Sequence, residues 1–363
     1  MQNCTGNPHA PCADAISRLQ KPIMTRKIAS KRGIFGLETI KQRSHVILTP
    51  VPWEVTTSYG SGTSLGPQAI LDASSQLDLF DLERGRATSG EVHLELEDPF
   101  FYQQNKKLKI LAKKIISELD QFGELSTKSS SNLKKINLEC AKMVRLIYEK
   151  TQAILRENKI PGLIGGDHST SLGAIQAVSE LFKGDIGVLH IDAHADLRSS
   201  YQGFQYSHAS IMHNVCSLKI GPKKLVQVGI RDFCEEEFEY IKKNKMRIAT
   251  YFDQHLKKSL FSGQAWNALC EKIISELPQN VYISFDIDGL SPEFCPHTGT
   301  PVPGGLSFDQ AIYLLGALGR SGRKIVGFDL TEVAPGPSGE WDANVGARIL
   351  FALCGLTEPP DQI

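Results

Sequence analysis

The segment from His190 to Asp196 carries four side chains that can bind a metal ion. It follows a short apolar run at 186–189 that is typical of a buried strand. Because a strand sends alternate side chains to the same side, residues 190, 192, 194 and 196 should converge at its carboxyl end. Two carboxylates and at least one imidazole crowded together repel one another and lose solvation unless a cation lies between them. This cluster therefore favours a metal site.

Other acids and imidazoles follow three further apolar runs of the chain. In an open α/β sheet, ligands bind outside the carboxyl ends of the strands. Four separate runs end in such residues, so we expect the side chains to meet at one edge of the sheet. Those outside the first cluster are His168 after the run at 161–164, Asp286 and Asp288 after the run at 281–285, and Glu332 after the run at 325–328.

The combined donor set exceeds what one small divalent ion needs. Four carboxylates and two imidazoles suit two ions that share bridging carboxylates, about 3.5–4 Å apart. The oxygen majority favours manganese, with nickel, iron or cobalt as alternatives, and disfavours zinc because no thiolate is present. Water held between two such ions is hydroxide near neutral pH, which indicates hydrolysis. The candidate ligands are His168, Asp192, His194, Asp196, Asp286 and Asp288.

Each of these motifs has an ordinary structural interpretation when taken alone. Asp286 and Asp288 can form a turn or cap a helix, and His168 can be a hydrogen-bonded structural histidine. Their occurrence together at four strand ends favours the metal interpretation. His190 lies deeper along its strand, so we expect a core or supporting role for it rather than a ligand role.

A glycine-rich segment, Gly60 to Gly66, offers a competing functional motif. It follows the first apolar run and precedes a helix expected at Pro67, as a dinucleotide-binding fingerprint does. Leu65 stands where the third glycine of that fingerprint belongs, and no acid at the end of a second strand completes it. The segment is therefore a weak indication of nucleotide binding.

The elements that must position these residues alternate between strands and helices. This alternation predicts an α/β fold with a mainly parallel sheet and helices on both faces. The polar stretch 124–135 predicts an exposed loop between two long helices. The expected strands lie at 46–50, 161–164, 186–191, 225–229, 247–251, 281–285 and 324–328, and the expected helices include 133–158, 169–182, 262–277 and 307–320.

Composition excludes several classes of protein. Lys plus Arg and Asp plus Glu are equal at 40 each in the 363 residues, so no global field favours nucleic acid or an anionic membrane. No apolar run is long enough to cross a bilayer. The eight cysteines are scattered without a C-x-x-C pair, as in a reducing compartment, and we expect a cytoplasmic protein.

The first forty residues differ from the rest of the chain. Residues 1–33 carry six Lys or Arg and a single acid, Asp14. This pattern is typical of a flexible extension or of an arm that packs on a neighbouring subunit, with a transit peptide as the alternative. We expect an N-terminal extension at 1–40 and one catalytic domain at 41–363.

Three motifs resemble the signatures of the ureohydrolases, the family of arginase, agmatinase, guanidinobutyrase and formimidoylglutamase. The resemblance covers roughly residues 44–355. It implies a three-layer α/β/α fold with an eight-stranded, mainly parallel sheet, two Mn²⁺ ions per subunit, and assembly into trimers or hexamers. The motifs are Gly-Gly-Asp-His-Ser at 165–169, Asp-Ala-His-Ala-Asp at 192–196, and Ser-Phe-Asp-Ile-Asp-Gly-Leu at 284–290 running on to Thr-Gly-Thr-Pro at 298–301.

The resemblance also implies a role for each residue. His208 occupies the place of a proton-shuttling histidine, Glu332 that of the acid that holds the guanidinium group, and Thr300 that of a residue beside that group. Together with His208, Asp196 would serve as acid and shuttle for the leaving amine. Among the ligands, His168 matches one metal and His194 the other, Asp192 and Asp286 match bridging carboxylates, and Asp196 and Asp288 complete the two shells.

The substrate is less well defined than the chemistry. Cys234, in the segment equivalent to arginase's Arg-Asp-x-Asp, cannot hold an ammonium as a carboxylate would, which disfavours arginine. The segments around Arg198 and Ser58 resemble the agmatinase branch, and His297 is expected near the pocket mouth. We therefore expect agmatine, giving putrescine and urea. The alternatives are aminopropylagmatine, a guanidino acid paired with Arg198, formimidoylglutamate and guanidine, or a catalytically silent structural subunit.

Overall fold

The computed structural model of the chain describes residues 33–81, 86–87, 91–337 and 340–357. Most of the expected N-terminal extension, residues 1–32, lies outside them. Within the last part of that expected extension, Ile34 and Phe35 are buried, and the ring of Phe35 packs edge-on against Phe351. No helix in the described part of the chain is both long and apolar enough to cross a membrane.

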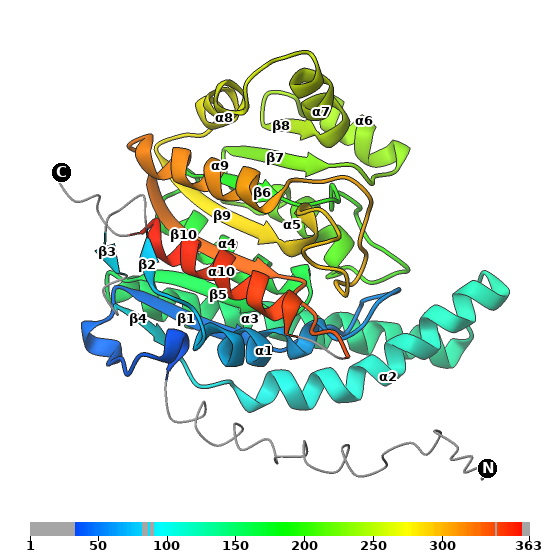
Figure 1. Cartoon of the computed structure of the whole chain (residues 1–363). Coiled ribbons are helices and arrows are strands. Elements are labelled where there is room, and N and C mark those ends of the chain that lie inside the picture. Colours follow the sequence, from blue (N-terminus) through cyan, green and yellow to red (C-terminus); the bar gives the residue numbers. More distant parts are fainter. Residues whose placement is uncertain (1–32, 82–85, 88–90, 338–339, 358–363) are drawn as a thin grey trace, which may run out of the picture.

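An eight-stranded parallel sheet runs through the centre of the molecule (Figure 1). Its strands are rich in β-branched residues and are buried on both faces, as expected for a parallel sheet covered by helices. In spatial order the strands are β4 (Val92–Leu94), β1 (Val46–Val51), β5 (Ile160–Gly165), β10 (Lys324–Thr331), β9 (Asn280–Asp286), β6 (Gly187–Ile191), β7 (Lys224–Ile230) and β8 (Ile248–Phe252).

The seven strands expected from the sequence are all present, and none of their ends differs from the expectation by more than three residues. The eighth, β4, was not expected, because it is only three residues long and pairs on one side alone, with β1. A separate two-stranded antiparallel ribbon is formed by β2 (Phe80–Asp81) and β3 (Arg86–Ala87).

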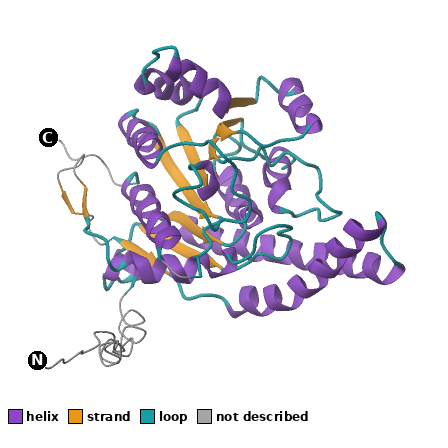
Figure 2. Ribbon diagram, turned by 45° about the vertical axis from the view of Figure 1, so that its right-hand side comes forward, coloured by secondary structure: helices purple, strands orange, loops and turns teal. Residues whose placement is uncertain are grey.

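Helices cover both faces of the sheet, which confirms the three-layer α/β/α fold (Figure 2). One apolar core lies between the sheet and helices α1, α8, α9 and α10, and the other between the sheet and helices α2 to α5. The helices are α1 (Gly66–Ser74), α2 (Pro99–Phe122), α3 (Thr127–Arg156), α4 (Ser171–Leu181), α5 (Ile211–Cys216), α6 (Glu235–Lys243), α7 (Asp253–Phe261), α8 (Trp266–Ser275), α9 (Phe308–Arg320) and α10 (Trp341–Gly355).

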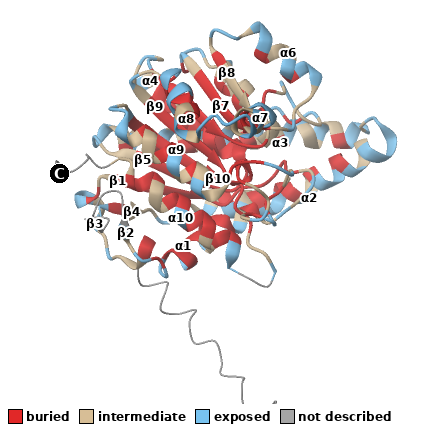
Figure 3. Cartoon of the chain, turned by 45° about the horizontal axis from the view of Figure 1, so that its top comes forward, coloured by how far each residue is buried: buried red, intermediate tan, exposed pale blue. Residues whose placement is uncertain are grey.

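The loop expected at 124–135 is wrong for most of its length, because α3 begins at Thr127. Ser126 caps this helix, its side chain accepting a hydrogen bond from the backbone N–H of Ser129. The polar residues of its first turns lie mostly on exposed faces, while Ile136 and Cys140 point into the core. A serine-rich composition therefore hid an amphipathic helix. Helices α2 and α3 pack side by side, and their connected end projects from the body with an exposed surface (Figure 3).

Four adjacent strands in the middle of the sheet carry the candidate site. In spatial order these are β5, β10, β9 and β6, and all point the same way. The expected metal ligands and Glu332 fall at or shortly after their carboxyl ends. The parallel register thus brings residues more than 160 positions apart in sequence to one place.

Candidate metal centre and its cavity

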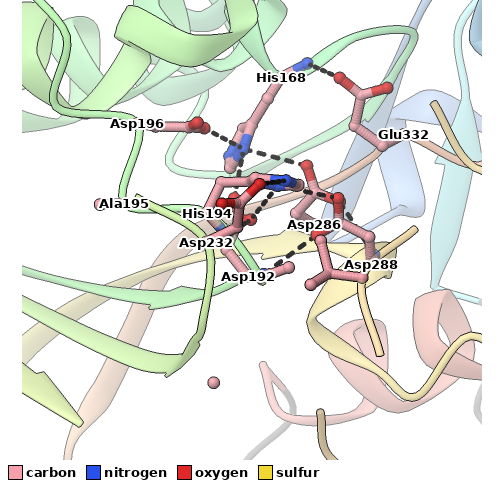
Figure 4. A network of polar contacts seen from close by, with 12 residues as sticks. His168, Asp192, His194, Ala195, Asp196, Asp232, Asp286, Asp288 and Glu332 are labelled. Atoms are coloured by element: carbon pink, nitrogen blue, oxygen red, sulfur yellow. Dashed lines mark hydrogen bonds and ion pairs between the residues drawn. The ribbon is translucent and has the colours of Figure 1, made fainter. Parts of the chain in front are cut away.

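His168 lies at the centre of a carboxylate cluster at the ends of β5, β6 and β9 (Figure 4). Its Nδ1 atom is 3.0 Å from Oδ2 of Asp192, 3.2 Å from Oδ2 of Asp196 and 3.2 Å from Oδ2 of Asp286. All four side chains are buried. The imidazole nitrogen and the three carboxylate oxygens are close enough together to coordinate one cation.

A second cluster forms around His194. Its Nδ1 atom is 3.1 Å from Oδ2 of Asp288 and 3.4 Å from Oδ1 of Asp192. The two oxygens of Asp192 therefore face different imidazoles, Oδ2 toward His168 and Oδ1 toward His194. A carboxylate placed in this way can contact a cation in each of the two clusters.

The electrostatics of both clusters favour a positive charge between the groups. Burial opposes protonation of His168, but its contacts with Asp192, Asp196 and Asp286 outweigh burial and hold its pKa well above its usual value. The Nδ1 atom of His168 is buried and has no hydrogen-bond partner in the described part of the chain. Divalent cations fit this donor set, because they satisfy the nitrogen and neutralise the carboxylates together.

His190 lies beside the first cluster and contacts Asp192. Its Nε2 lies 2.8 Å from Oδ2 of Asp192, and its Nδ1 lies 3.1 Å from Nε2 of Gln227. Burial lowers the pKa of His190. A neutral imidazole held by Gln227 can donate to Asp192 and fix the carboxylate's orientation.

Tight turns after the strands aim the acids at the centre. Oδ1 of Asp286 accepts a hydrogen bond from the backbone N–H of Asp288 (2.9 Å), so these two residues do form a turn as well as facing the imidazoles. Asp196 and Glu332 have φ values of 53° and 61°, in the left-handed region. Such a conformation costs about 1–3 kcal/mol in a non-glycine residue and is typical of functional sites.

Glu332 lines a small cavity beside the metal centre. Its Oε1 accepts a hydrogen bond from the backbone N–H of His168 (3.0 Å), while its Oε2 is buried without a hydrogen-bond partner among the described residues. A Cβ at position 299 would lie 3.3 Å from Oε2, so Gly299 keeps this oxygen accessible. The cavity is lined by Thr57, Ser58, Tyr59, Gly60, His208, Gly299, Thr300 and Glu332.

His208 lines both this cavity and a second one. Burial, followed by the positive charges of His194 and Lys109, lowers the pKa of His208 to about 3. Its imidazole is therefore neutral at pH 7. Oγ of Ser207 lies 3.4 Å from its Nδ1, which leaves Nε2 as the nitrogen for proton exchange.

The second cavity, of about 120 Å³, extends from the metal centre toward solvent. Asp232 lines it with a side chain that is 66% exposed and 3.7 Å from Nε2 of His194. Arg198 lines it too, but its Nε is 3.5 Å from Oε2 of Glu237 and its guanidinium lies over the ring of Tyr201. The charge of Arg198 is thus compensated locally, whereas Asp232 presents a carboxylate to the cavity.

Other residues singled out from the sequence lie elsewhere. His297 is not among the residues that line the two cavities, and its Nδ1 lies 2.9 Å from Oδ2 of Asp342 at the start of α10. Gly60 forms part of the cavity wall, where its N–H donates to the carbonyl of Gly299 (2.9 Å). Cys234 precedes α6, and its N–H donates to Glu237 (2.9 Å).

Several residues of the site were missed from the sequence. Ser284 lies two residues before Asp286 on the same face of β9, a spacing that would have identified it. Glu237 and Tyr201 carry no signal of this kind, because their role depends on the fold of the loops around Arg198.

Comparisons with known proteins agree with this geometry. Residues 44–355 match the model of the arginase family. The N(1)-aminopropylagmatine ureohydrolase of Thermus thermophilus is 31% identical over 90% of this chain and 94% of its own length. The agmatinase of Halalkalibacterium halodurans is 34% identical over 81% and 85%. The structure of proclavaminate amidino hydrolase from Streptomyces clavuligerus superimposes with a TM-score of 0.70 at 24% identity, covering 90% of this chain and 96% of that one.

Proposed function

The chain belongs to the arginase family, a family of ureohydrolases, and we propose that it hydrolyses a small guanidino compound with a cationic tail, agmatine or aminopropylagmatine. The oxygen of water joins the guanidinium carbon, the bond from that carbon to the substituted nitrogen breaks, and the products are urea and an amine. From agmatine the amine is putrescine. The observation that carries the proposal is the position of Asp192 between two imidazole–carboxylate clusters.

Two divalent ions, with manganese as the first choice and nickel as an alternative, complete the proposed centre. His168, Asp192, Asp196 and Asp286 would hold one ion. His194 and Asp288 would hold the other, with Asp192 and Asp286 shared between them. When bound, such a pair of ions supplies water activated for attack near neutral pH.

Glu332 is the proposed partner of the substrate's guanidinium group. A guanidinium of this type enters the site charged, because its pKa is above 12. Burial raises the pKa of Glu332 well above its usual range, and a charged guanidinium at its buried Oε2 would hold it as a carboxylate acceptor. Thr300 lines the same cavity and orients the group.

The leaving amine requires a proton, which we assign to His208 and Asp196. Both line the cavity of about 120 Å³, beside the ligands of the centre. The imidazole of His208 is neutral at pH 7, and its place in both cavities would let it pass a proton between solvent and the leaving nitrogen.

The charges around the second cavity favour a cationic tail over an acidic one. Asp232 offers a carboxylate there, and the nearby Arg198 is paired with Glu237. A guanidino acid would have to compete with Glu237 for Arg198. Two relatives, an agmatinase and an N(1)-aminopropylagmatine ureohydrolase, support a substrate with a cationic tail.

The proposal also covers the compartment and the assembly state of the protein. We place it in the cytoplasm, on the grounds of its scattered thiols and balanced charge. We expect it to assemble as a homo-oligomer, a trimer or hexamer. Size-exclusion chromatography with light scattering tests the assembly, and a monomer at micromolar concentration would contradict it.

A substrate panel tests the proposed activity. The manganese-loaded and nickel-loaded enzyme is given agmatine, aminopropylagmatine, 4-guanidinobutyrate, arginine, guanidine and formimidoylglutamate. Urea and amine are measured, and formamide for the last compound. We expect kcat/KM at least tenfold higher for a cationic-tailed compound than for an acid, and no turnover by the Asp192→Asn variant. A preference for arginine or an acid would overturn the assignment, and a metal-loaded protein inactive on the whole panel would indicate a silent subunit.

A further inference from the structure

One face of helix α2 supports the loop that forms a wall of the substrate cavity. Asn105 and Lys109, one turn apart, lie on the buried face of the helix and point at the segment after β1. Oδ1 of Asn105 accepts a hydrogen bond from the backbone N–H of Glu54 (2.8 Å). This contact fixes the start of the loop.

Lys109 holds the next part of the loop with all of its donors. Its Nζ donates to the carbonyl of Glu54 (2.7 Å), to the carbonyl of Thr57 (3.3 Å) and to the hydroxyl of Thr57. An ammonium group has three N–H donors, so these contacts use its full capacity. The side chain is only 9% exposed, and burial lowers its pKa.

Glu54 extends the support to the far end of the same loop. Its Oε2 accepts hydrogen bonds from the backbone N–H of Gly62 (2.6 Å) and of Ser64 (3.3 Å). Residues 57–60, between these anchors, line the cavity with His208, Thr300 and Glu332. Lys109 is therefore connected to the cavity wall at both ends of the loop, directly at Thr57 and through Glu54.

Residues 57–61 of the loop are not tightly packed on the side that faces α2. On its outer side, residues 57–61 border an open cavity of about 410 Å³, whose other lining residues all come from α2. Val55 is packed in the apolar core, but residues 58–61 border a cavity, so the hydrogen bonds at Thr57 and Gly62 contribute to holding them in place. At the tip of the loop, the backbone N–H of Gly60 donates to the carbonyl of Gly299 (2.9 Å).

We propose that Lys109 is a positioning residue for catalysis: by fixing residues 54–60, it places the cavity wall against the guanidino substrate without touching that substrate. The expected effect of Lys109 on turnover rests on the proposed function. Its effect on the mobility of the loop is measurable without any substrate.

The experiment compares Lys109→Met with Lys107→Met, a control on the exposed side of the same helix. Both variants remove an ammonium and keep a linear side chain. We expect Lys109→Met to increase deuterium uptake in the peptide that covers residues 54–64, and to lower kcat/KM for the preferred substrate about 10–100-fold, mainly through KM. Metal content should stay at the wild-type value. Lys109→Arg, which keeps the charge and the donors, should recover part of the loss.

The outcomes separate the two proposals. If Lys109→Met matches Lys107→Met in loop exchange or in KM, Lys109 does not position the wall. Loss of bound metal in Lys109→Met would also overturn the inference, since it would indicate a general structural role. If Lys109→Met fails to fold, Asn105→Ala removes the neighbouring anchor and must show the same rise in exchange and KM. If the wild type turns over no guanidino compound, the proposed function fails while the exchange comparison still decides the role of Lys109.

Discussion

The Nε2 atom of His168 lies 2.9 Å from the hydroxyl oxygen of Ser284, and that hydroxyl lies 2.9 Å from Oδ1 of Asp329. All three side chains are buried at adjacent strand ends. Because Asp329 takes the hydroxyl proton, the Ser284 oxygen is left to accept the N–H of His168 Nε2. This chain fixes the imidazole with its Nδ1 toward the three carboxylates, the orientation that a ligand needs.

Ser284→Ala should therefore weaken metal binding while leaving every proposed ligand in place. Removing a partner that orients a ligand costs 10–100-fold in metal affinity. Manganese affinity is measured by titrating the metal-free protein in a calorimeter, with Ser275→Ala on the exposed side of α8 as the control. Equal affinities for the two variants would show that Ser284 does not orient His168.

Asp232→Asn tests the cationic-tail assignment. Because the Asp232 carboxylate is exposed, its attraction for the cationic tail of the substrate is modest. We therefore expect the KM for agmatine to rise about tenfold and kcat to change less. Asp78→Asn, at an exposed position, is the control for a lost charge. An unchanged KM for agmatine, or an equal rise for guanidine, which has no tail, would remove Asp232 from tail recognition.

His208 makes stability depend on pH in a predictable direction. Its pKa is lowered to about 3 in the folded protein, against about 6.5 when unfolded, so the unfolded chain binds more protons between these values. Its contribution to stability is present above pH 6.5 and decreases as the pH falls. Between pH 6.5 and 5, the wild type should lose about 1–2 kcal/mol more than His208→Asn.

Urea unfolding at the two pH values and a fixed manganese concentration measures this difference. The same variant should lose about 100-fold or more in kcat at pH 7.5, as expected for a group that transfers protons. Parallel stability losses in both proteins would mean that His208 is solvated and titrates normally.

His297→Ala tests the contact between His297 and Asp342. The Asp342 carboxylate is buried and accepts from both the ring and the backbone N–H of His297. Loss of the ring partner should lower the free energy of unfolding by about 1–3 kcal/mol. His255→Ala, on the exposed side of α7, should change it by less than about 0.5 kcal/mol. A similar effect for both would show that the contact with Asp342 contributes nothing in solution.

The sequence predicted the parts of this molecule that follow strict local patterns. Apolar runs ended by acids and imidazoles located β5, β6, β9 and β10, because parallel topology forces their carboxyl ends together. The position of His190 inside β6 likewise distinguished it from Asp192, His194 and Asp196, which follow the strand's end. Composition was a poorer guide, and it misassigned the start of α3 as a loop.

The remaining residues depend on contacts between distant segments. Lys109 reaches Thr57 from a helix 52 positions away, and Glu237 compensates Arg198 across 39 positions. Nothing in the local pattern of either residue distinguishes it from an ordinary surface charge. Such pairs form only once the loops have packed, so a single sequence does not reveal them.

The central claim is that this chain holds two metal ions bridged by Asp192. Diffraction from manganese-soaked crystals, recorded at the manganese absorption edge, tests it most directly. The account predicts two anomalous peaks about 3.5–4 Å apart, one beside Nδ1 of His168 and one beside Nδ1 of His194, each next to one oxygen of Asp192. A single peak, or none, at saturating manganese would contradict it.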